Sequence, residues 1–155
     1  MRSTLFKPVD ASNRQVALAV RPKPEQQRFV STVAESLADA ERYGGGWPRL
    51  MLDGDEPVAF VMGGFGDAST KQFPRSAVWK LVVAADHQGK GYGAAAVREV
   101  AAEALRRGDT RLGVFFHPGE DGPEGFWLHL GFVRTDKYGG GREVYAEVDI
   151  TTLLG

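Results

Sequence analysis

A glycine-spaced turn at residues 88–93, with the sequence Gln-Gly-Lys-Gly-Tyr-Gly, carries the clearest chemistry in this chain. It joins an apolar run with a strand pattern to a run with helical spacing that begins at Ala94. Glycines allow positive φ angles and a close backbone approach, so consecutive N–H groups can converge on an anion at a helix N-terminus. Lys90 adds a positive charge. The turn is therefore predicted to bind phosphate.

Two common phosphate-binding loops fit this turn poorly. A P-loop needs four residues between its first glycine and Gly-Lys-Ser/Thr, and no Ser or Thr follows Lys90. The dinucleotide fingerprint G-x-G-x-x-A is matched by Gly89, Gly91 and Ala94, but it belongs in the first βα turn of a larger sheet. An acidic residue should also end the next strand, whereas Asp109 precedes the next apolar run.

The spacing Gln88-x-x-Gly91-x-Gly93 resembles a third loop, the Q/R-x-x-G-x-G/A motif of the GNAT superfamily of N-acetyltransferases, which grips the pyrophosphate of acetyl-CoA. Residues 125–132, Gly-Phe-Trp-Leu-His-Leu-Gly-Phe, resemble the short helix and L-G-F turn of the same superfamily. Residues 26–43, 60–62 and 122–126 are similar to its diamine (spermine/spermidine) acetyltransferase branch.

The resemblance implies a fold and a cofactor site. The expected fold class is α/β with an α+β mixed sheet, the acyl-CoA N-acyltransferase fold, whose mostly antiparallel central sheet contains a βαβ cofactor-binding unit. In that family the strand before the loop pairs its backbone with the pantetheine arm, and the short helix packs beside the acyl end. The residues implied in binding acetyl-CoA are Leu81, Val82, Val83, Gln88, Gly89, Lys90, Gly91, Tyr92, Gly93 and Trp127.

Acetyl transfer to an amine needs a base for the ammonium and an acid for the leaving thiolate. His117 is the candidate catalytic base because it ends a strand expected next to the cofactor strand; a surface histidine before Pro118 is the alternative reading. The superfamily commonly places a tyrosine acid where this chain has Trp127, and an indole cannot deliver a proton at neutral pH. The remaining candidate donors are water, Tyr92, Tyr138 and Tyr145.

The predicted acceptor is a primary amine, in particular a small polyamine such as spermidine or spermine. Each protonated amine that is not being acetylated needs a counter-charge. Glu35 and Asp39 are the candidate substrate-binding residues, and Glu120, Asp121 and Glu124 lie in a later loop. The alternatives are an aminoglycoside, an amino acid or a peptide N-terminus as acceptor, or a non-catalytic acyl-CoA-binding regulatory module.

The elements that must position these residues follow from apolar spacing. Residues 25–43 have a helical face, and an Asp-Gly turn at 53–54 separates two β-compatible runs. Strands are expected at 4–9, 49–53, 57–64, 76–84, 111–116, 132–135 and 143–149. The resulting order, β-α-α-β-β-β-α-β-α-β-β, implies a mixed sheet with helices on its faces and a βαβ unit at its centre.

Length and composition limit the number of domains, the kinds of partner and the location that can be expected. A chain of 155 residues that is 43% hydrophobic is the size of one domain, so residues 1–155 are predicted to form a single domain. The formal net charge of −1 gives no basic field for nucleic acid or anionic membrane. No run approaches the ~20 apolar residues of a membrane span, and the first residues lack the apolar core of a signal peptide, so a cytoplasmic location is predicted.

The chain has no cysteine, which excludes a thiol nucleophile and thiolate metal ligands. The histidines at 87, 117 and 129 are too scattered for a zinc pair, so no metal is expected. Acetyl transfer should therefore proceed by direct attack of the amine on acetyl-CoA in a ternary complex. A homodimer is possible through the exposed edge of the last strands.

Overall fold

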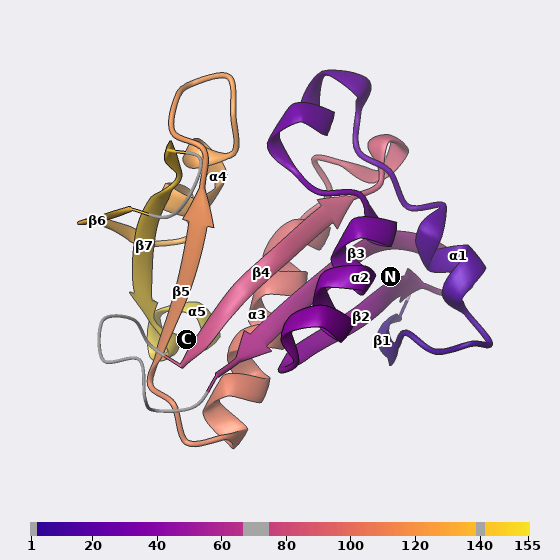
Figure 1. Cartoon of the computed structure of the whole chain (residues 1–155), viewed down its shortest axis with the longest axis horizontal. Coiled ribbons are helices and arrows are strands. Elements are labelled where there is room, and N and C mark those ends of the chain that lie inside the picture. The colour runs from indigo at the N-terminus through magenta and orange to yellow at the C-terminus, as the bar shows by residue number, and fades with distance from the viewer. Residues whose placement is uncertain (1–2, 67–74, 139–141) are drawn as a thin grey trace.

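Seven strands form one mixed sheet in the computed structural model, which describes residues 3–66, 75–138 and 142–155 (Figure 1). The strands, in chain order, are β1 (Thr4–Pro8), β2 (Gly46–Asp53), β3 (Glu56–Phe65), β4 (Ser76–Val83), β5 (Arg111–Phe116), β6 (Val133–Tyr138) and β7 (Val144–Asp149). The helices are α1 (Arg14–Leu18), α2 (Val33–Tyr43), α3 (Tyr92–Arg106), α4 (Glu124–His129) and α5 (Ile150–Leu154), with 3₁₀ turns η1 (Pro24–Phe29) and η2 (Ala85–His87). None of these helices is long and apolar enough to cross a membrane.

The strand order in the sheet is β1-β2-β3-β4-β5-β7-β6, and β4 with β5 form its parallel pair while the other neighbours run antiparallel. The chain crosses from β4 to β5 through α3, so β4-α3-β5 is a βαβ unit at the middle of the sheet. The fold class predicted from the sequence is confirmed.

The parallel pair β4–β5 is short. Within the described strands, β4 and β5 pair at Ala77↔Gly113 and Val78↔Val114, and the two strands then diverge toward their C-terminal ends (Figure 1). On its other side β4 keeps β3 as a partner as far as Val83. The β5-facing backbone edge of residues 81–83 therefore has no strand partner among the described strands. We call this diverging region the strand fork.

A bulge on β4 lies where the fork opens. The β3–β4 register runs from Met62↔Lys80 to Gly63↔Val78, which leaves Trp79 as the extra residue. Such a bulge bends its strand and increases the local twist, so it re-aims the end of β4 away from β5. The indole of Trp79 lies over Gly64, where a Cβ would overlap the ring.

Helices cover both faces of the sheet (Figure 1). On one face α3 and α5 pack over the central strands, and Val97, Val100 and Ala104 of α3 are fully buried at helical spacing. On the other face Val33 and Leu37 of α2 join a second cluster. Each fully buried valine or leucine side chain contributes roughly 1.5–3 kcal/mol, so both faces hold the sheet in place.

The helix predicted for residues 25–43 is wrong in its first half. Pro24–Phe29 forms the 3₁₀ turn η1, Val30 is extended (φ −137°, ψ 149°), and the α-helix begins only at Val33. Thr32 and Glu35 form a capping box, in which each side chain accepts from the other residue's backbone N–H, and this starts a new helix. The Thr-x-x-Glu pattern at residues 32–35 indicates this helix start, but the prediction followed the apolar spacing instead.

The remaining differences are small. The Asp-Gly turn between β2 and β3 is confirmed, with Gly54 at φ +63°. The C-terminal helix α5 was not predicted; its Ile150 and Leu153 are buried in the core with α3. The glycine run at 139–141, which separates the last two strands in the sequence, lies outside the described residues.

Gly113 offers a direct test of this packing. A Cβ at Gly113 would lie 2.7 Å from Cζ and 2.8 Å from Cε1 of the buried Tyr145, whereas a Cβ at Gly125 would have nothing within 4 Å. We expect Gly113→Ala to lower the free energy of unfolding by about 1–3 kcal/mol through overpacking. Gly125→Ala is the matched control and should not lower stability. Urea unfolding measures both, and equal effects of the two changes would contradict the packing described here.

Candidate active site

The glycine turn leads directly into the open N-terminus of α3. Gly89 (φ +76°) and Gly91 (φ +89°) adopt left-handed backbone conformations, and Gly91 is the N-cap of the helix. α3 has neither a side-chain cap nor an acidic residue in its first turn, in contrast to the capped α2. The first N–H groups of a helix have no intrahelical acceptor, and together with the helix dipole they favour an anion.

Gly93 is needed for close packing rather than for a left-handed backbone conformation. A Cβ on Gly93 would meet two ring atoms of Phe126 at 3.0 and 3.1 Å and Val83 Cγ2 at 3.5 Å. Phe126 belongs to α4, so the absence of a side chain at Gly93 lets α4 pack against the start of α3. This contact closes one side of the loop.

The Gln88 side chain points back into the fold. Its Nε2 donates to Gln26 Oε1 at 2.7 Å and to the Val83 carbonyl at 3.0 Å, while Gln26 Nε2 donates to Gln88 Oε1 at 3.0 Å. Gln26 Oε1 also accepts from the Lys23 backbone N–H at 3.1 Å. This reciprocal amide pair ties the glycine turn to η1 and to the end of β4.

Tyr92 and His87 tie the same turn to the β2–β3 hairpin. The Tyr92 hydroxyl donates to Asp53, and His87 Nε2 lies 3.1 Å from Glu56 Oε1. The two rings pack edge to face with centroids 6.1 Å apart. Lys90, by contrast, is exposed at the tip of the turn and lines neither of the two cavities described next.

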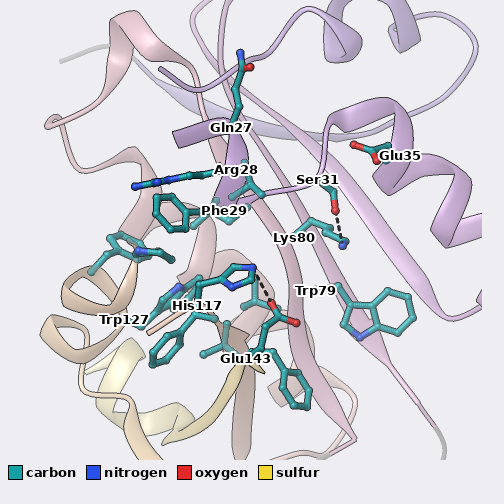
Figure 2. Close-up of a pocket in the computed structure, with 18 residues that line it drawn as sticks. Gln27, Arg28, Phe29, Ser31, Glu35, Trp79, Lys80, His117, Trp127 and Glu143 are labelled. Carbon is teal, nitrogen blue, oxygen red and sulfur yellow. Dashed lines mark hydrogen bonds and ion pairs between the residues drawn. The ribbon is translucent and has the colours of Figure 1, made fainter. Parts of the chain in front are cut away.

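Two cavities adjoin at the strand fork. The loop cavity, about 460 Å³, is lined by the glycine turn, the end of β4 and η1. The His117 cavity, about 580 Å³, is lined by η1, β4, the end of β5 and α4 (Figure 2). Their shared residues are Phe29, Val30, Leu81, Pro123 and Phe126. The diverging strands therefore provide one continuous depression, with the open N-terminus of α3 at one end and a second chamber at the other.

His117 and Glu143 face each other in the His117 cavity (Figure 2). His117 Nε2 lies 4.0 Å from Glu143 Oε2, and the side chains are 37% and 34% exposed. The Phe29 ring packs 6.1 Å from the imidazole. Phe116, the last residue of β5, pairs with Val144, the first residue of β7. The antiparallel register therefore brings His117, which follows Phe116, beside Glu143, which precedes Val144. Sequence reasoning missed Glu143, because its place beside His117 follows from the β5–β7 register, which pairs segments distant in the sequence.

The chain's sequence matches the family model described as the acetyltransferase (GNAT) family over residues 13–132. The chain belongs to the GNAT family of acetyltransferases. The enzyme class predicted from the sequence, an acetyl-CoA-dependent N-acetyltransferase, is confirmed. A search of curated proteins by sequence finds no match.

Solved structures with the same fold agree with this family. PaiA N-acetyltransferase from Thermoplasma acidophilum, in complex with coenzyme A, has a TM-score of 0.70 at 10% identity over 95% of this chain and 99% of that one. A GNAT family acetyltransferase from Elizabethkingia anophelis with acetyl-CoA bound has a TM-score of 0.63 at 16% identity, covering 94% and 97%. The ribosomal-protein-S18-alanine N-acetyltransferase from Escherichia coli has a TM-score of 0.66 at 15% identity, covering 96% and 94%.

Trp127 of this GNAT protein is a packing residue. It is 5% exposed and packs edge to face against Phe126 and Phe132, with ring centroids 4.9 and 5.2 Å away. It also forms part of the wall of the His117 cavity. The side chain therefore shapes the cavity from within the core.

The candidate tyrosine acids of this GNAT protein lie outside the His117 cavity. Tyr145 is buried against Gly113, and burial, followed by the nearby Glu147, raises the pKa of its phenol well above the usual value. Tyr138 is exposed on β6, and Tyr92 lines the loop cavity with its hydroxyl on Asp53. Among the described residues, no tyrosine lines the His117 cavity. Tyr145 is thereby poorly suited to protonate a leaving group.

The carboxylates predicted to bind an amine have structural partners. Glu35 lines the His117 cavity, but it caps α2, and the hydrogen bonds from Thr32 hold the pKa of its carboxyl below the usual value. Asp39 does not line the cavity and lies 3.7 Å from Lys80 Nζ. In the later loop, Asp121 pairs with Arg28 at 2.8 Å and Glu124 with Arg134 at 3.1 Å. The described residues contain no group of three or more potential metal ligands.

The amide pair between Gln26 and Gln88 should be measurable as a coupling free energy. Each glutamine changed to alanine removes hydrogen bonds worth about 0.5–1.5 kcal/mol apiece. We expect Gln26→Ala and Gln88→Ala to be non-additive by about 0.5–1.5 kcal/mol in a double-mutant cycle of urea unfolding. Gln27→Ala is the matched control on the adjacent exposed residue and should change stability by less than about 0.5 kcal/mol. Strict additivity of the two changes would show that the pair does not join η1 to the turn.

Proposed function

We propose that this GNAT protein transfers the acetyl group of acetyl-CoA to a primary amine by direct attack within a ternary complex. The observation that carries the proposal is the strand fork beside the uncapped N-terminus of α3. There the open N-terminus of α3, a strand edge with no strand partner among the described strands, and a second chamber adjoin in one continuous depression.

The loop cavity supports the cofactor's position. The pyrophosphate would be held by the N–H groups at the start of α3, and the pantetheine arm would take the place that β5 leaves open beside residues 81–83. A free N–H at that edge could polarise the thioester carbonyl. The two related structures that hold coenzyme A or acetyl-CoA have the same fold, which supports this placement. The roles of Leu81, Val82, Val83 and the glycine turn in binding are parts of this proposal.

The His117 cavity supports the acceptor's position. The amine must lose a proton before its nitrogen attacks the carbonyl carbon; His117 takes that proton directly or through water. The C–N bond forms as the C–S bond breaks, and the thiolate leaves and is protonated by solvent. Glu143 stands near enough to balance the charge on a protonated His117. No covalent acyl-enzyme is needed, in keeping with a chain that has no cysteine.

The polyamine acceptor stays a prediction. Its support is the resemblance of residues 26–43, 60–62 and 122–126 to the diamine acetyltransferase branch and the presence of Glu143 and Glu35 in the cavity. The ion pairs and cap made by the other carboxylates weaken the argument for an acidic entrance. A primary amine is therefore the class on which the proposed function rests.

Ala94 offers a test of cofactor binding that leaves α3 stable. It lines the loop cavity in the first turn of the helix, where a carboxylate is favourable for helix stability but competes with a bound phosphate. We expect acetyl-CoA to bind Ala94→Glu at least about tenfold more weakly than the isosteric Ala94→Gln, as one lost charged contact is worth about 1.4 kcal/mol or more. Isothermal titration measures both affinities.

Turnover is then measured as free CoA released with primary amines at saturating acetyl-CoA. Equal affinity of the Glu and Gln variants would remove the phosphate assignment of the turn. Tight acetyl-CoA binding with no CoA released for any amine would favour the regulatory acyl-CoA-binding module over the enzyme.

The pH profile tests His117. If His117 accepts the amine proton, His117→Gln should lower kcat/KM by about 10²-fold or more and flatten the loss of activity on acidification. Glu143→Gln should cost only about 2–5-fold, because a partly exposed pair contributes at most about 1 kcal/mol. His129→Gln is the matched control, since His129 is exposed on α4 and lines neither cavity. An unchanged acidic limb in His117→Gln would assign the proton transfer to another group.

A further inference from the structure

Lys80 of β4 places an ammonium group in the wall of the His117 cavity (Figure 2). Its Nζ donates to Ser31 Oγ at 2.9 Å and lies 3.7 Å from Asp39 Oδ2, which is an ion pair beyond hydrogen-bond distance. A lysine ammonium has three N–H donors. Within the described part of the chain, the bond to Ser31 accounts for one of them, so the others can donate to a ligand in the cavity.

The position of Lys80 is fixed by the strand. Lys80 follows the bulged Trp79 and precedes Leu81, the residue shared by the two cavities. Its side chain is 27% exposed, so the charge is less screened than at an open surface. Lys80 therefore stands one residue before the strand edge at which the thioester would lie.

Arg28 lines the cavity with its guanidinium in an ion pair with Asp121 at 2.8 Å, and the other charged groups of the cavity lie on two walls. Figure 2 shows His117 and Glu143 together and Lys80 with Ser31 at a separate place on the cavity wall. Glu35 also lines the cavity, but its carboxylate is exposed and engaged by the Thr32 cap. An acceptor with only positive charges would be repelled by the Lys80 ammonium. An acceptor that carries both an amine and a carboxylate would find Glu143 for the first and Lys80 for the second.

We propose that the acceptor is a primary amine that also carries a carboxylate, such as an amino acid or a short peptide, and that Lys80 binds this carboxylate. The amine then lies toward Glu143 and His117, within reach of the base, and the carboxylate lies toward Lys80. This inference rests on the proposed function, because it assigns the second chamber to the acceptor.

The alternative role of Lys80 is to neutralise Asp39 and Glu35, which would leave the cavity suited to a polyamine. The two roles differ in what a neutral substitution does. If Lys80 binds the acceptor's carboxylate, removing the ammonium weakens the binding of acceptors that carry a carboxylate and leaves the binding of other acceptors unchanged. A neutralising role makes all acceptors respond alike, or makes cationic acceptors bind more tightly.

The test compares alanine, alaninamide and spermidine as acceptors, with release of CoA as the readout. Alanine and alaninamide differ in the carboxylate and share the α-amine. We expect the wild-type protein to use alanine with a kcat/KM at least about tenfold above that of alaninamide, and Lys80→Met to reduce this ratio by about 10-fold or more through KM, as a hydrogen bond to a charged group implies. Asp39→Asn removes the competing carboxylate and should not raise the KM for alanine.

Three results would overturn the inference: equal use of alanine and alaninamide, an equal loss for both acceptors in Lys80→Met, or a preference for spermidine that Lys80→Met strengthens. Titration of alanine into the CoA-loaded protein separates this inference from the proposed function. Lys80-dependent binding of alanine without any turnover would support the carboxylate site while the acetyl-transfer proposal fails. Turnover of amines with no dependence on Lys80 would leave the proposed function standing and the carboxylate site refuted.

Discussion

The parting of β4 from β5 is the constraint on which the rest of the site depends. A parallel pair that stayed hydrogen-bonded along its length would bury the edge of residues 81–83 and close both cavities. Here the pairing ends at Val78↔Val114, and a bulge at Trp79 turns β4 aside. An unpaired strand edge inside a protein is costly unless something completes its hydrogen bonds. The fork is therefore a departure from regular sheet structure. It also offers a strand edge whose hydrogen bonds a linear ligand with amide groups can complete.

The charged residues around the fork differ in how closely a partner within the fold engages their charge. Glu35 forms part of a helix cap, and Asp121 and Glu124 each pair with an arginine; the pair between Asp121 and Arg28 joins segments far apart in the sequence. Exposed pairs of this kind contribute little to stability, about 0–1 kcal/mol each, so their main effect is on geometry. Glu143, His117 and Lys80 line the His117 cavity with looser ion pairs, 4.0 Å between His117 and Glu143 and 3.7 Å from Lys80 to Asp39. Counting acidic residues in the sequence could not separate these two groups, because the distinction depends on partners brought by the fold.

The sequence predicted the central βαβ unit and the phosphate turn because both are local. Glycine spacing, apolar runs and an Asp-Gly turn act over a few residues, and the structure confirms the elements they imply. It did not predict the break at Val30, where the Thr32–Glu35 capping box competes with helical apolar spacing. Nor could it predict Glu143 beside His117 or Lys80 in the cavity wall. Those placements depend on strand register and on the bulge at Trp79, and both are set by pairing between distant segments.

The two cavities are also joined mechanically through η1. This 3₁₀ turn contributes Gln26 to the loop cavity and Arg28 to the His117 cavity, and its Phe29 lines both. A six-residue 3₁₀ turn has few hydrogen bonds of its own, so its position depends on outside contacts. The amide pair from Gln26 to Gln88 supplies such a contact, and Gln88 in turn holds the Val83 carbonyl at the end of β4. Hence the segment that packs Phe29 against His117 is fixed by the same side chain that fixes the glycine turn. Gln88 thus acts as a support between the two ends of the site, and the proposed contact with an anion falls to the glycine backbone beside it.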